Sequence, residues 1–356
     1  MPKIAINISP IFDGNSIRGV GYYTINLING IQKEIKNNKN YKGWSIKLIK
    51  KKSSTKSGKY DLIHYPFFDP FNLTLSLDKY IPTIITVHDL IPREFKKHFP
   101  VGVKGTSKWL IQKNKLKKVS RIITVSNYSK NIINKITKYP LKKIFTTYLA
   151  ADASFKPISD IKQLNSIKQK YHLPDKFILF VGDINWNKNI PNLVKACFDL
   201  NYPLVIVGSA ATKKNVPHHP WTKDLLWLQS QKSPNLIFTG FVPDEDLPLI
   251  FNLATIYCQP SFAEGFGLPL IQAMQSGCPI AYSQTSCLPE IMNNSGISFD
   301  PYSTESIKNV LKKYWTNSKI RQLYRQKGIN RAKIFNWSLT AQKTLAVYKL
   351  ALLNEK

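Results

Sequence analysis

The sequence contains no hydrophobic run long enough to cross a membrane. Its longest apolar segments, such as FILFVG at 177–182 and PLVIVG at 203–208, are about a third of the roughly 20 residues that a membrane-spanning helix needs. The chain does not begin with a charged segment followed by an apolar one, so no signal peptide is indicated. These absences predict a cytoplasmic protein.

Cysteine is scarce, and its spacing excludes the common disulfide and zinc arrangements. The four cysteines form no CxxC pair and have no histidine partner at zinc spacing. We therefore expect buried free thiols in a reducing compartment. The acidic run at 244–246 has the form of a metal-binding DxD motif, but it precedes the apolar segment LPLIF and suits the first turn of a helix. No bound metal is expected.

Acidic residues are few: 21 Asp and Glu stand against 51 Lys and Arg, a formal net charge of +30. Residues 1–150 hold 28 basic and 7 acidic residues (net +21), whereas residues 151–356 hold 23 and 14 (net +9). A compositional bias that places lysines on solvent-exposed faces would explain the high number of basic residues, but not their concentration in residues 1–150. A basic N-terminal half suggests an anionic partner, either acidic lipid or nucleic acid.

A length of 356 residues exceeds the size at which one hydrophobic core usually keeps growing, so two domains are expected. In the first half, short β-branched segments alternate with helical ones, which predicts a parallel, doubly wound sheet. The expected strands are 3–9, 45–50, 61–65, 83–89 and 121–126, and the expected helices run from about 22 to 34 and from 103 to 119.

The same alternation restarts after a polar, Lys-rich connection at about 156–172. Strands are expected at 177–183, 203–209, 235–241, 253–261 and 279–283, with a helix at 189–200. We therefore predict an N-terminal domain at 1–171, a C-terminal domain at 172–338 and an amphipathic final helix at 339–356.

The segment FAEGFGLPLIQAMQSGCPI at 262–280 has the features of an anion site. Gly265 and Gly267 allow close approach of a ligand to the backbone, and the helix expected from Leu268 offers unpaired N–H groups. Glu264 would repel an anion, so it fits hydroxyl groups of a sugar attached beyond a phosphate. A helix-terminal charge followed by an ordinary glycine turn is the structural alternative on spacing alone.

Extended with its two preceding residues, this segment resembles the E-x7-E signature of the family 4 retaining glycosyltransferases of the GT-B class. Six further segments resemble the same family in the expected order: IRGVGYYTINL, TVHDLIP, VGDINWNKN, TGFVPDEDLP, SCLPEI and IFNWSLTAQKTLAVY. The resemblance implies an α/β GT-B fold, with two Rossmann-like doubly wound domains facing across a cleft. It also implies that the second domain binds the nucleotide sugar and that the final helix crosses back to the first.

The resemblance assigns roles to residues of the signature. Glu264 would bind hydroxyls of the donor sugar, and the backbone amides of Gly265, Phe266, Gly267 and Leu268 would bind the diphosphate. Relatives carry a second acid that binds the ribose hydroxyls, and Gln272 occupies that place here. An amide can still accept and donate hydrogen bonds, but it loses the charge-assisted component.

Lys188 matches the lysine that neutralises the diphosphate in this family. Many relatives carry an arginine beside it or after the preceding strand glycine, where this chain has Asn187 and Asp183. Stabilisation of the leaving group would then depend on Lys188, the helix dipole and Arg18. Asn187 and Arg18 are accordingly included among the expected donor-binding residues.

In the N-terminal half, His88 ends the strand TIITV and matches the histidine that lies beside the donor sugar in the family. We expect it to contact the sugar and to handle a proton. A histidine satisfied within the core is the structural alternative. Gly19 and Gly21 form a GxG sequence expected to be a loop near the sugar phosphate or the acceptor. The expected catalytic residues are therefore His88, Glu264 and Lys188.

The basic segment at 96–120 alternates lysines with apolar residues that include Trp109. It is interpreted either as an amphipathic helix packed on the sheet or as a docking element for an anionic membrane with Trp109 at the interface. No recognised nucleic-acid-binding module accompanies the charge.

The sequence therefore predicts a metal-independent retaining hexosyltransferase that uses a nucleoside diphosphate sugar and needs no cofactor. The expected acceptor is a saccharide or lipid-linked saccharide in the synthesis of a cell-surface polysaccharide such as O-antigen, capsule or lipopolysaccharide, at the inner face of the cytoplasmic membrane. Two alternatives are a degenerate GT-B protein that binds nucleotide or glycan without turnover, and a basic nucleic-acid-binding protein.

Overall fold

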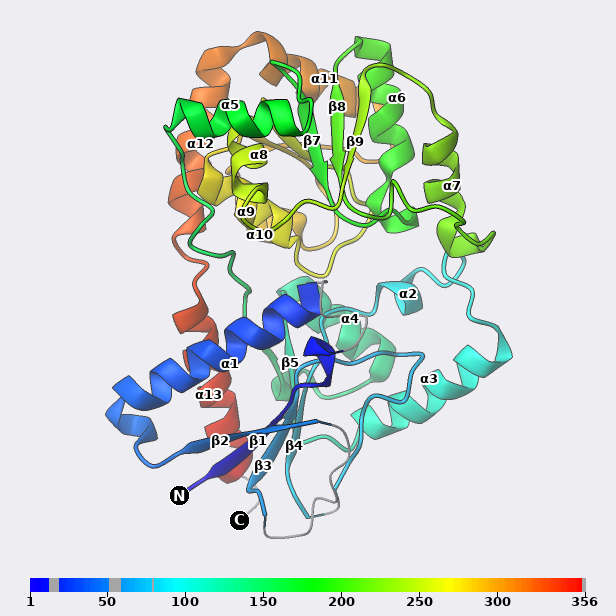
Figure 1. Cartoon of the computed structure of the whole chain (residues 1–356). Coiled ribbons are helices and arrows are strands. Elements are labelled where there is room, and N and C mark those ends of the chain that lie inside the picture. Colours follow the sequence, from blue (N-terminus) through cyan, green and yellow to red (C-terminus); the bar gives the residue numbers. More distant parts are fainter. Residues whose placement is uncertain (13–18, 51–58, 79, 354–356) are drawn as a thin grey trace. The chain divides into compact units, whose positions relative to one another are not determined.

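The computed structural model describes residues 1–12, 19–50, 59–78 and 80–353 (Figure 1). The chain divides into two compact units. Unit 1 consists of residues 1–96, 101–150 and 336–356, and unit 2 of residues 97–100 and 151–335. Each unit contains one six-stranded parallel sheet, which confirms the prediction of two Rossmann-like α/β domains.

The strand order in the sheet of unit 1 is β2-β1-β3-β4-β5-β6. The direction in which successive strands are added therefore reverses between β1 and β3. The three residues paired between β1 and β3 run from Ile4–Leu62 to Ile6–His64. The strands are short, and β1, β3, β4 and β5 are largely buried, as the β-branched runs predict. They are β1 (Lys3–Asn7), β2 (Ser45–Ile49), β3 (Leu62–Tyr65), β4 (Thr83–Thr86), β5 (Arg121–Thr124) and β6 (Ile144–Thr146).

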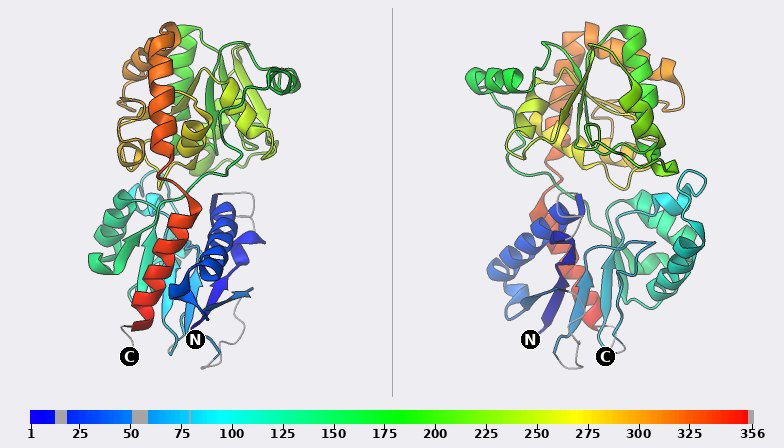
Figure 2. Two further views of the ribbon diagram at one scale, coloured as in Figure 1. Left: turned by 90° about the vertical axis from the view of Figure 1, so that its left-hand side faces the viewer. Right: turned by 45° about the vertical axis from the view of Figure 1, so that its right-hand side comes forward.

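The helices of unit 1 include one from the far end of the sequence. The final helix α13 lies beside α1 and contacts β3 and β5 (Figure 2). A buried hydrogen bond of 2.6 Å joins His64 Nδ1 on β3 to the Tyr348 hydroxyl on α13. The helices are α1 (Gly19–Asn37), α2 (Ile91–Glu94), α3 (Gly102–Leu116), α4 (Asn127–Thr137) and α13 (Trp337–Leu353), with 3-10 turns η1 (Ser9–Ile11), η2 (Lys39–Tyr41) and η3 (Leu141–Lys143).

Trp109 lies in the core of unit 1, which supports the interpretation of this segment as a helix packed on the sheet and shows that the alternative, Trp109 at a membrane interface, is wrong. Its side chain is only 3% exposed, and the Arg93 guanidinium lies 5.0 Å from its ring centroid. The large indole is placed on the face of α3 that packs on the protein interior, because burial of its apolar surface is favourable. Other apolar residues of α3 remain exposed, among them Val103 and Leu110.

The sheet of unit 2 has the order β12-β11-β10-β7-β8-β9, with helices on both faces (Figure 2). Its strands are β7 (Ile178–Val181), β8 (Leu204–Val207), β9 (Leu236–Gly240), β10 (Ile256–Gln259), β11 (Ile280–Ser283) and β12 (Ile297–Phe299). Its helices are α5 (Ile161–Lys170), α6 (Ile190–Leu200), α7 (Lys223–Ser230), α8 (Leu247–Leu253), α9 (Leu268–Ser276), α10 (Leu288–Met292), α11 (Thr304–Thr316) and α12 (Ser318–Ala332), with 3-10 turns η4 (Trp186–Lys188) and η5 (Pro220–Thr222).

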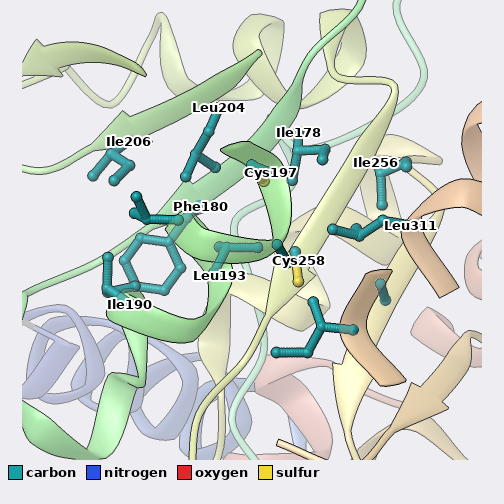
Figure 3. Packing of buried hydrophobic residues seen from close by; sticks show 14 of the residues in the cluster. Ile178, Phe180, Ile190, Leu193, Cys197, Leu204, Ile206, Ile256, Cys258 and Leu311 are labelled. Atoms are coloured by element: carbon teal, nitrogen blue, oxygen red, sulfur yellow. The ribbon is translucent and has the colours of Figure 1, made fainter. Parts of the chain in front are cut away.

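A cluster of aliphatic and aromatic side chains fills the space between this sheet and its neighbouring helices (Figure 3). Phe180 from β7, Leu193 from α6 and Leu311 from α11 are fully buried there. Cys197 and Cys258 belong to the same cluster, and Cys278 and Cys287 are also buried and free. The predicted buried thiols are confirmed, and burial raises the pKa of each of them.

The Lys-rich connection predicted between the domains contains helix α5. Asp160 caps its N-terminus by accepting a hydrogen bond from Gln163 N. α5 packs against α8, and Lys170 and Tyr171 each hydrogen-bond to the Asp246 carboxylate at 2.6 Å. The main segment of unit 2 begins at Ala151 and includes this helix, whereas the predicted domain limit lies after it.

Candidate functional site

A glycine turn connects β10 to the N-terminus of α9. Gly267 has a φ of 86°, in the left-handed region that favours glycine. An added Cβ at Gly267 would lie 3.1 Å from Leu270 Cδ1 and 3.2 Å from Leu288 Cδ2. Among the described residues, no side-chain hydrogen bond caps α9, and the positive end of its helix dipole attracts anions.

Lys188 and Glu264 form a partly buried ion pair beside this turn. The Lys188 ammonium lies 2.8 Å from Glu264 Oε1 and 3.0 Å from Oε2. The side chains are 21% and 8% exposed, which limits the screening of their attraction by water. The two expected catalytic residues of unit 2, which are 76 positions apart in the chain, therefore meet at one place.

Polar groups of the surrounding loop hold Glu264 on several sides. Oε1 of its carboxylate accepts hydrogen bonds from Gln259 Nε2 at 2.7 Å and from the Ser261 hydroxyl at 2.6 Å. Its backbone N–H donates to Ser286 Oγ at 3.0 Å. A carboxylate this deeply buried needs such donors, because an unpaired buried charge is costly.

Asn187 fastens the loop that carries Glu264 to the turn that carries Lys188. The Asn187 side-chain amide donates to the Ala263 carbonyl at 2.9 Å, and the Asn187 backbone carbonyl accepts from Phe262 N at 2.8 Å. The rings of Trp186 and Phe262 stack at 5.0 Å, which adds an apolar contact between the same two segments. Donor binding by Asn187 itself stays a prediction, since its amide nitrogen is bonded to the protein backbone.

The remaining signature residues lie in and before α9. The Phe266 ring is buried and packs edge-on against the Phe335 ring in the interior, with ring centroids 5.9 Å apart. Leu268 begins the helix, and Gln272 lies about one turn further on, half-buried. Among the described residues, the Gln272 amide has no side-chain hydrogen-bond partner. Its predicted contact with a ribose stays a prediction.

In unit 1, His88 follows β4 and contacts the segment after β3. His88 Nε2 lies 3.1 Å from the Pro66 carbonyl oxygen. A carbonyl only accepts, so Nε2 carries the proton and Nδ1 carries the lone pair. Burial lowers the pKa of His88 to about 4, and the imidazole is therefore neutral at pH 7. The Tyr23 ring stands edge-on to it, with centroids 4.7 Å apart.

Gly19 and Gly21 lie within the first turn of α1, so the predicted loop at these positions is wrong. Gly21 is buried in the helix. Helix formation there is favoured because the buried apolar residues of the segment, Leu27 and Ile28 among them, recur at helical spacing. Arg18, expected near the diphosphate, lies outside the described residues.

A cavity of about 560 Å³ opens in unit 1 at the carboxyl ends of β1 and β3. Those two strands flank the point where the strand order of this sheet reverses, which is where open α/β sheets bind ligands. Phe67, which lies 6.5 Å from the His88 ring, lines the cavity, and so does Pro66. Asn7, Thr74 and other polar residues line it as well, giving a site of mixed character.

Gln259 and Ser261 are functional candidates that were not predicted from the sequence. The sequence does contain a signal for Gln259, which is a polar residue at the end of the otherwise apolar run that forms β10. Both are almost completely buried, and both bond to Glu264. Residues 244–246 immediately precede α8, with Asp246 at its N-cap, so they lie just before the first turn in which they were expected.

Comparison with known protein families covers both units. The model of "Glycosyl transferases group 1" matches residues 162–331, and that of "Glycosyltransferase Family 4" matches residues 17–155. The chain is 31% identical over 239 residues to O-antigen chain mannosyltransferase B of Escherichia coli, an alignment of 64% of this chain and 60% of that protein. It thus spans less than two thirds of the length of this relative.

Solved structures of low sequence identity share the fold. A sucrose-phosphate synthase from Thermosynechococcus elongatus superposes with a TM-score of 0.73 at 16% identity, covering 99% of this chain and 100% of that one. HepE of Anabaena, solved in complex with UDP-glucose, gives a TM-score of 0.73 at 14% identity over 98% and 100% of the two chains. Both halves of the chain thus match models of group 1 and family 4 glycosyltransferases, and its two Rossmann-like units have the GT-B fold.

Proposed function

We propose that this protein is a retaining hexosyltransferase that moves a sugar from a nucleoside diphosphate sugar to a hydroxyl group of a saccharide. The observation that carries the proposal is the Lys188–Glu264 pair beside the N-terminus of α9. A cation and a helix N-terminus suit a diphosphate, and the adjacent carboxylate suits sugar hydroxyls.

In the proposed reaction, the leaving diphosphate gains negative charge as the bond to the anomeric carbon breaks. Lys188 and the α9 N-terminus stabilise that charge, and Glu264 orients the sugar by accepting from its hydroxyls. The Lys188 ammonium has three donors, so it can bond to the diphosphate while keeping Glu264 in reach. This chemistry uses residues of unit 2 and needs no metal or other cofactor.

The acceptor saccharide is proposed to bind in the cavity of unit 1. Its volume of about 560 Å³ falls within the range of small-molecule sites. Aromatic and proline surfaces suit the apolar faces of sugar rings, and the polar lining suits their hydroxyls. Neutral His88, with its Nδ1 lone pair, is proposed to accept a hydrogen bond from a hydroxyl of the bound sugars.

The relatives support a particular sugar and process. The name of the relative O-antigen chain mannosyltransferase B refers to both mannose and a surface polysaccharide. We propose mannosyl transfer in the synthesis of such a polymer. HepE was solved with UDP-glucose bound, which makes a UDP-sugar the second donor to test.

We further propose that unit 1 contacts an anionic membrane surface that carries a lipid-linked acceptor. Within the described residues, no helix has both the length and the apolar character required to span a bilayer. Exposed Val103, Leu110 and Ile111 on α3 stand among lysines, a combination that suits an interfacial contact. Failure to bind anionic vesicles at low salt would remove this part of the proposal.

The test is a turnover assay with GDP-mannose, UDP-glucose, ADP-glucose and a dTDP-sugar, each with and without mannose-terminated oligosaccharides. We expect nucleotide release with one donor, and a product whose anomeric proton shows the configuration of the donor. Glu264→Gln is expected to lose activity, whereas Glu305→Gln, which alters an exposed ion pair with Lys308, is the matched control. Donor binding without release would instead support a binding protein, and no binding of any donor would refute the proposal.

A further inference from the structure

Gln259 connects the sheet of unit 2 to Glu264 through a buried chain of hydrogen bonds. It is the last residue of β10 and is 1% exposed. Its Nε2 donates to Glu264 Oε1 and to Ser261 Oγ, each at 2.7 Å. Its Oε1 accepts from the hydroxyl of Tyr257, a fully buried residue of the same strand. This series of hydrogen bonds thus begins at Tyr257 inside the strand and ends at the Glu264 carboxylate.

The partners of Gln259 determine which way its amide points. A carboxylate oxygen accepts only, so the group facing Glu264 must be the NH2. The phenol hydroxyl of Tyr257 then donates to the amide oxygen, and the reverse orientation would place two oxygens against each other. Because β10 lies inside the sheet between β11 and β7, this donor has a fixed position.

The two oxygens of Glu264 have different surroundings. Oε1 accepts from Gln259, from Ser261 and from Lys188, all at 2.6–2.8 Å. Among the described residues, Oε2 accepts from Lys188 at 3.0 Å. A carboxylate oxygen with a single such partner can accept another hydrogen bond, whereas Oε1 is saturated.

We propose that Gln259 is a positioning residue that holds Glu264 Oε1, so that Oε2 is presented to the hydroxyls of the donor sugar. This inference rests on the proposed function, since it assumes that Glu264 binds the sugar. Gln259 acts on the sugar part of the donor through Glu264 and has no part in binding the nucleotide. A hydrogen bond made by a fixed carboxylate costs less entropy than one made by a mobile carboxylate.

The experiment compares the affinity for the nucleoside diphosphate sugar with the affinity for the bare nucleoside diphosphate, by calorimetry. In Gln259→Met, we expect the affinity for the nucleotide sugar to fall about tenfold, because a hydrogen bond to a charged group is lost. The affinity for the bare nucleotide is expected to change less than twofold. Gln229→Met is the matched control, since Gln229 also donates two hydrogen bonds in unit 2 but to backbone carbonyls of Ala211 and Lys213.

A purely structural role for Gln259 would lower both affinities together, and that result would overturn the inference. Tyr257→Phe is a milder variant that removes the hydroxyl fixing the Gln259 amide, and it should shift the ratio in the same direction by a few fold. Adding Gln259→Met to Glu264→Ala should change the ratio less than twofold, because the residue through which Gln259 acts is already gone. If the effects of Gln259→Met and Glu264→Ala on the affinity ratio multiplied in the double variant, the inference would be contradicted. Absence of binding by the wild-type protein would count against the proposed function instead.

Discussion

Acidification is predicted to weaken the part of unit 1 where α13 meets the sheet, through His64. This histidine is fully buried, with Nδ1 2.6 Å from the Tyr348 hydroxyl and Nε2 2.9 Å from Thr86 Oγ1. Burial, with a smaller contribution from the charge of His88, lowers the pKa of His64 to about 3. The folded protein therefore keeps this ring neutral at pH values where the unfolded chain protonates it.

The sign follows from proton linkage. Below pH 6.5 the unfolded state binds more protons at His64 than the folded state, so stability falls as the pH falls towards 3. The loss is about 1.4 kcal/mol for each pH unit below the unfolded pKa, which gives about 2 kcal/mol between pH 7 and pH 5. His64→Gln cannot take up a proton and should lack this part of the pH dependence, whatever its stability at pH 7.

Native-state hydrogen exchange followed by mass spectrometry can measure the effect on peptides from β3 and α13, after correction for the intrinsic pH dependence of exchange. The change in protection between pH 7 and pH 5 should be about 2 kcal/mol larger in the wild type than in His64→Gln. The control is His218→Gln, which alters an exposed histidine of unit 2. The same pH-dependent loss in the wild type and in His64→Gln would refute the reasoning.

Two further predictions concern unit 2. Gly208→Ala should lower its unfolding free energy by about 1–3 kcal/mol, because the added Cβ would lie 2.5 Å from the Gly182 carbonyl oxygen. Gly19→Ala, whose Cβ would meet no atom of the described residues within 4 Å, is the control in thermal unfolding, and equal melting temperatures of the two variants would contradict the argument. Gln272→Glu should strengthen nucleoside diphosphate binding several-fold by restoring a charge-assisted bond to the ribose, as measured by calorimetry. Unchanged affinity would mean that this side chain does not bind the ribose.

Long β-branched runs made much of the fold predictable. The run 83–89, for example, contains β4, and the run 121–126 contains β5. The three-residue strands β6 and β12 were not predicted, because so short a segment carries no periodicity and is defined by its pairing with β5 or β11. Helix α5 was also missed, because it buries only Ile167 among its ten residues and reads as a polar connection.

The individual signature residues could be named from the sequence, but their contacts could not. Glu264 was identified from its spacing to the glycines, and Lys188 from the segment VGDINWNKN. That these two side chains bond to each other depends on how strands β7 and β10 pair, which brings distant loops to one edge of the sheet. The bonds of Gln259 to Glu264 likewise depend on side-chain geometry at the end of β10, which residue spacing does not specify.

Unit 2 is proposed to bind the diphosphate of a sugar donor through Lys188. The most direct test of this proposal is calorimetric titration of the nucleoside diphosphate into the wild type, Lys188→Met and Lys308→Met. Lys308 belongs to a more exposed ion-pair cluster of the same unit and serves as the matched control. We expect a loss of affinity of about tenfold or more in Lys188→Met, because a charge-assisted bond disappears and Glu264 is left without its cation, and no loss in Lys308→Met. Equal affinity of the wild type and Lys188→Met would contradict the proposal.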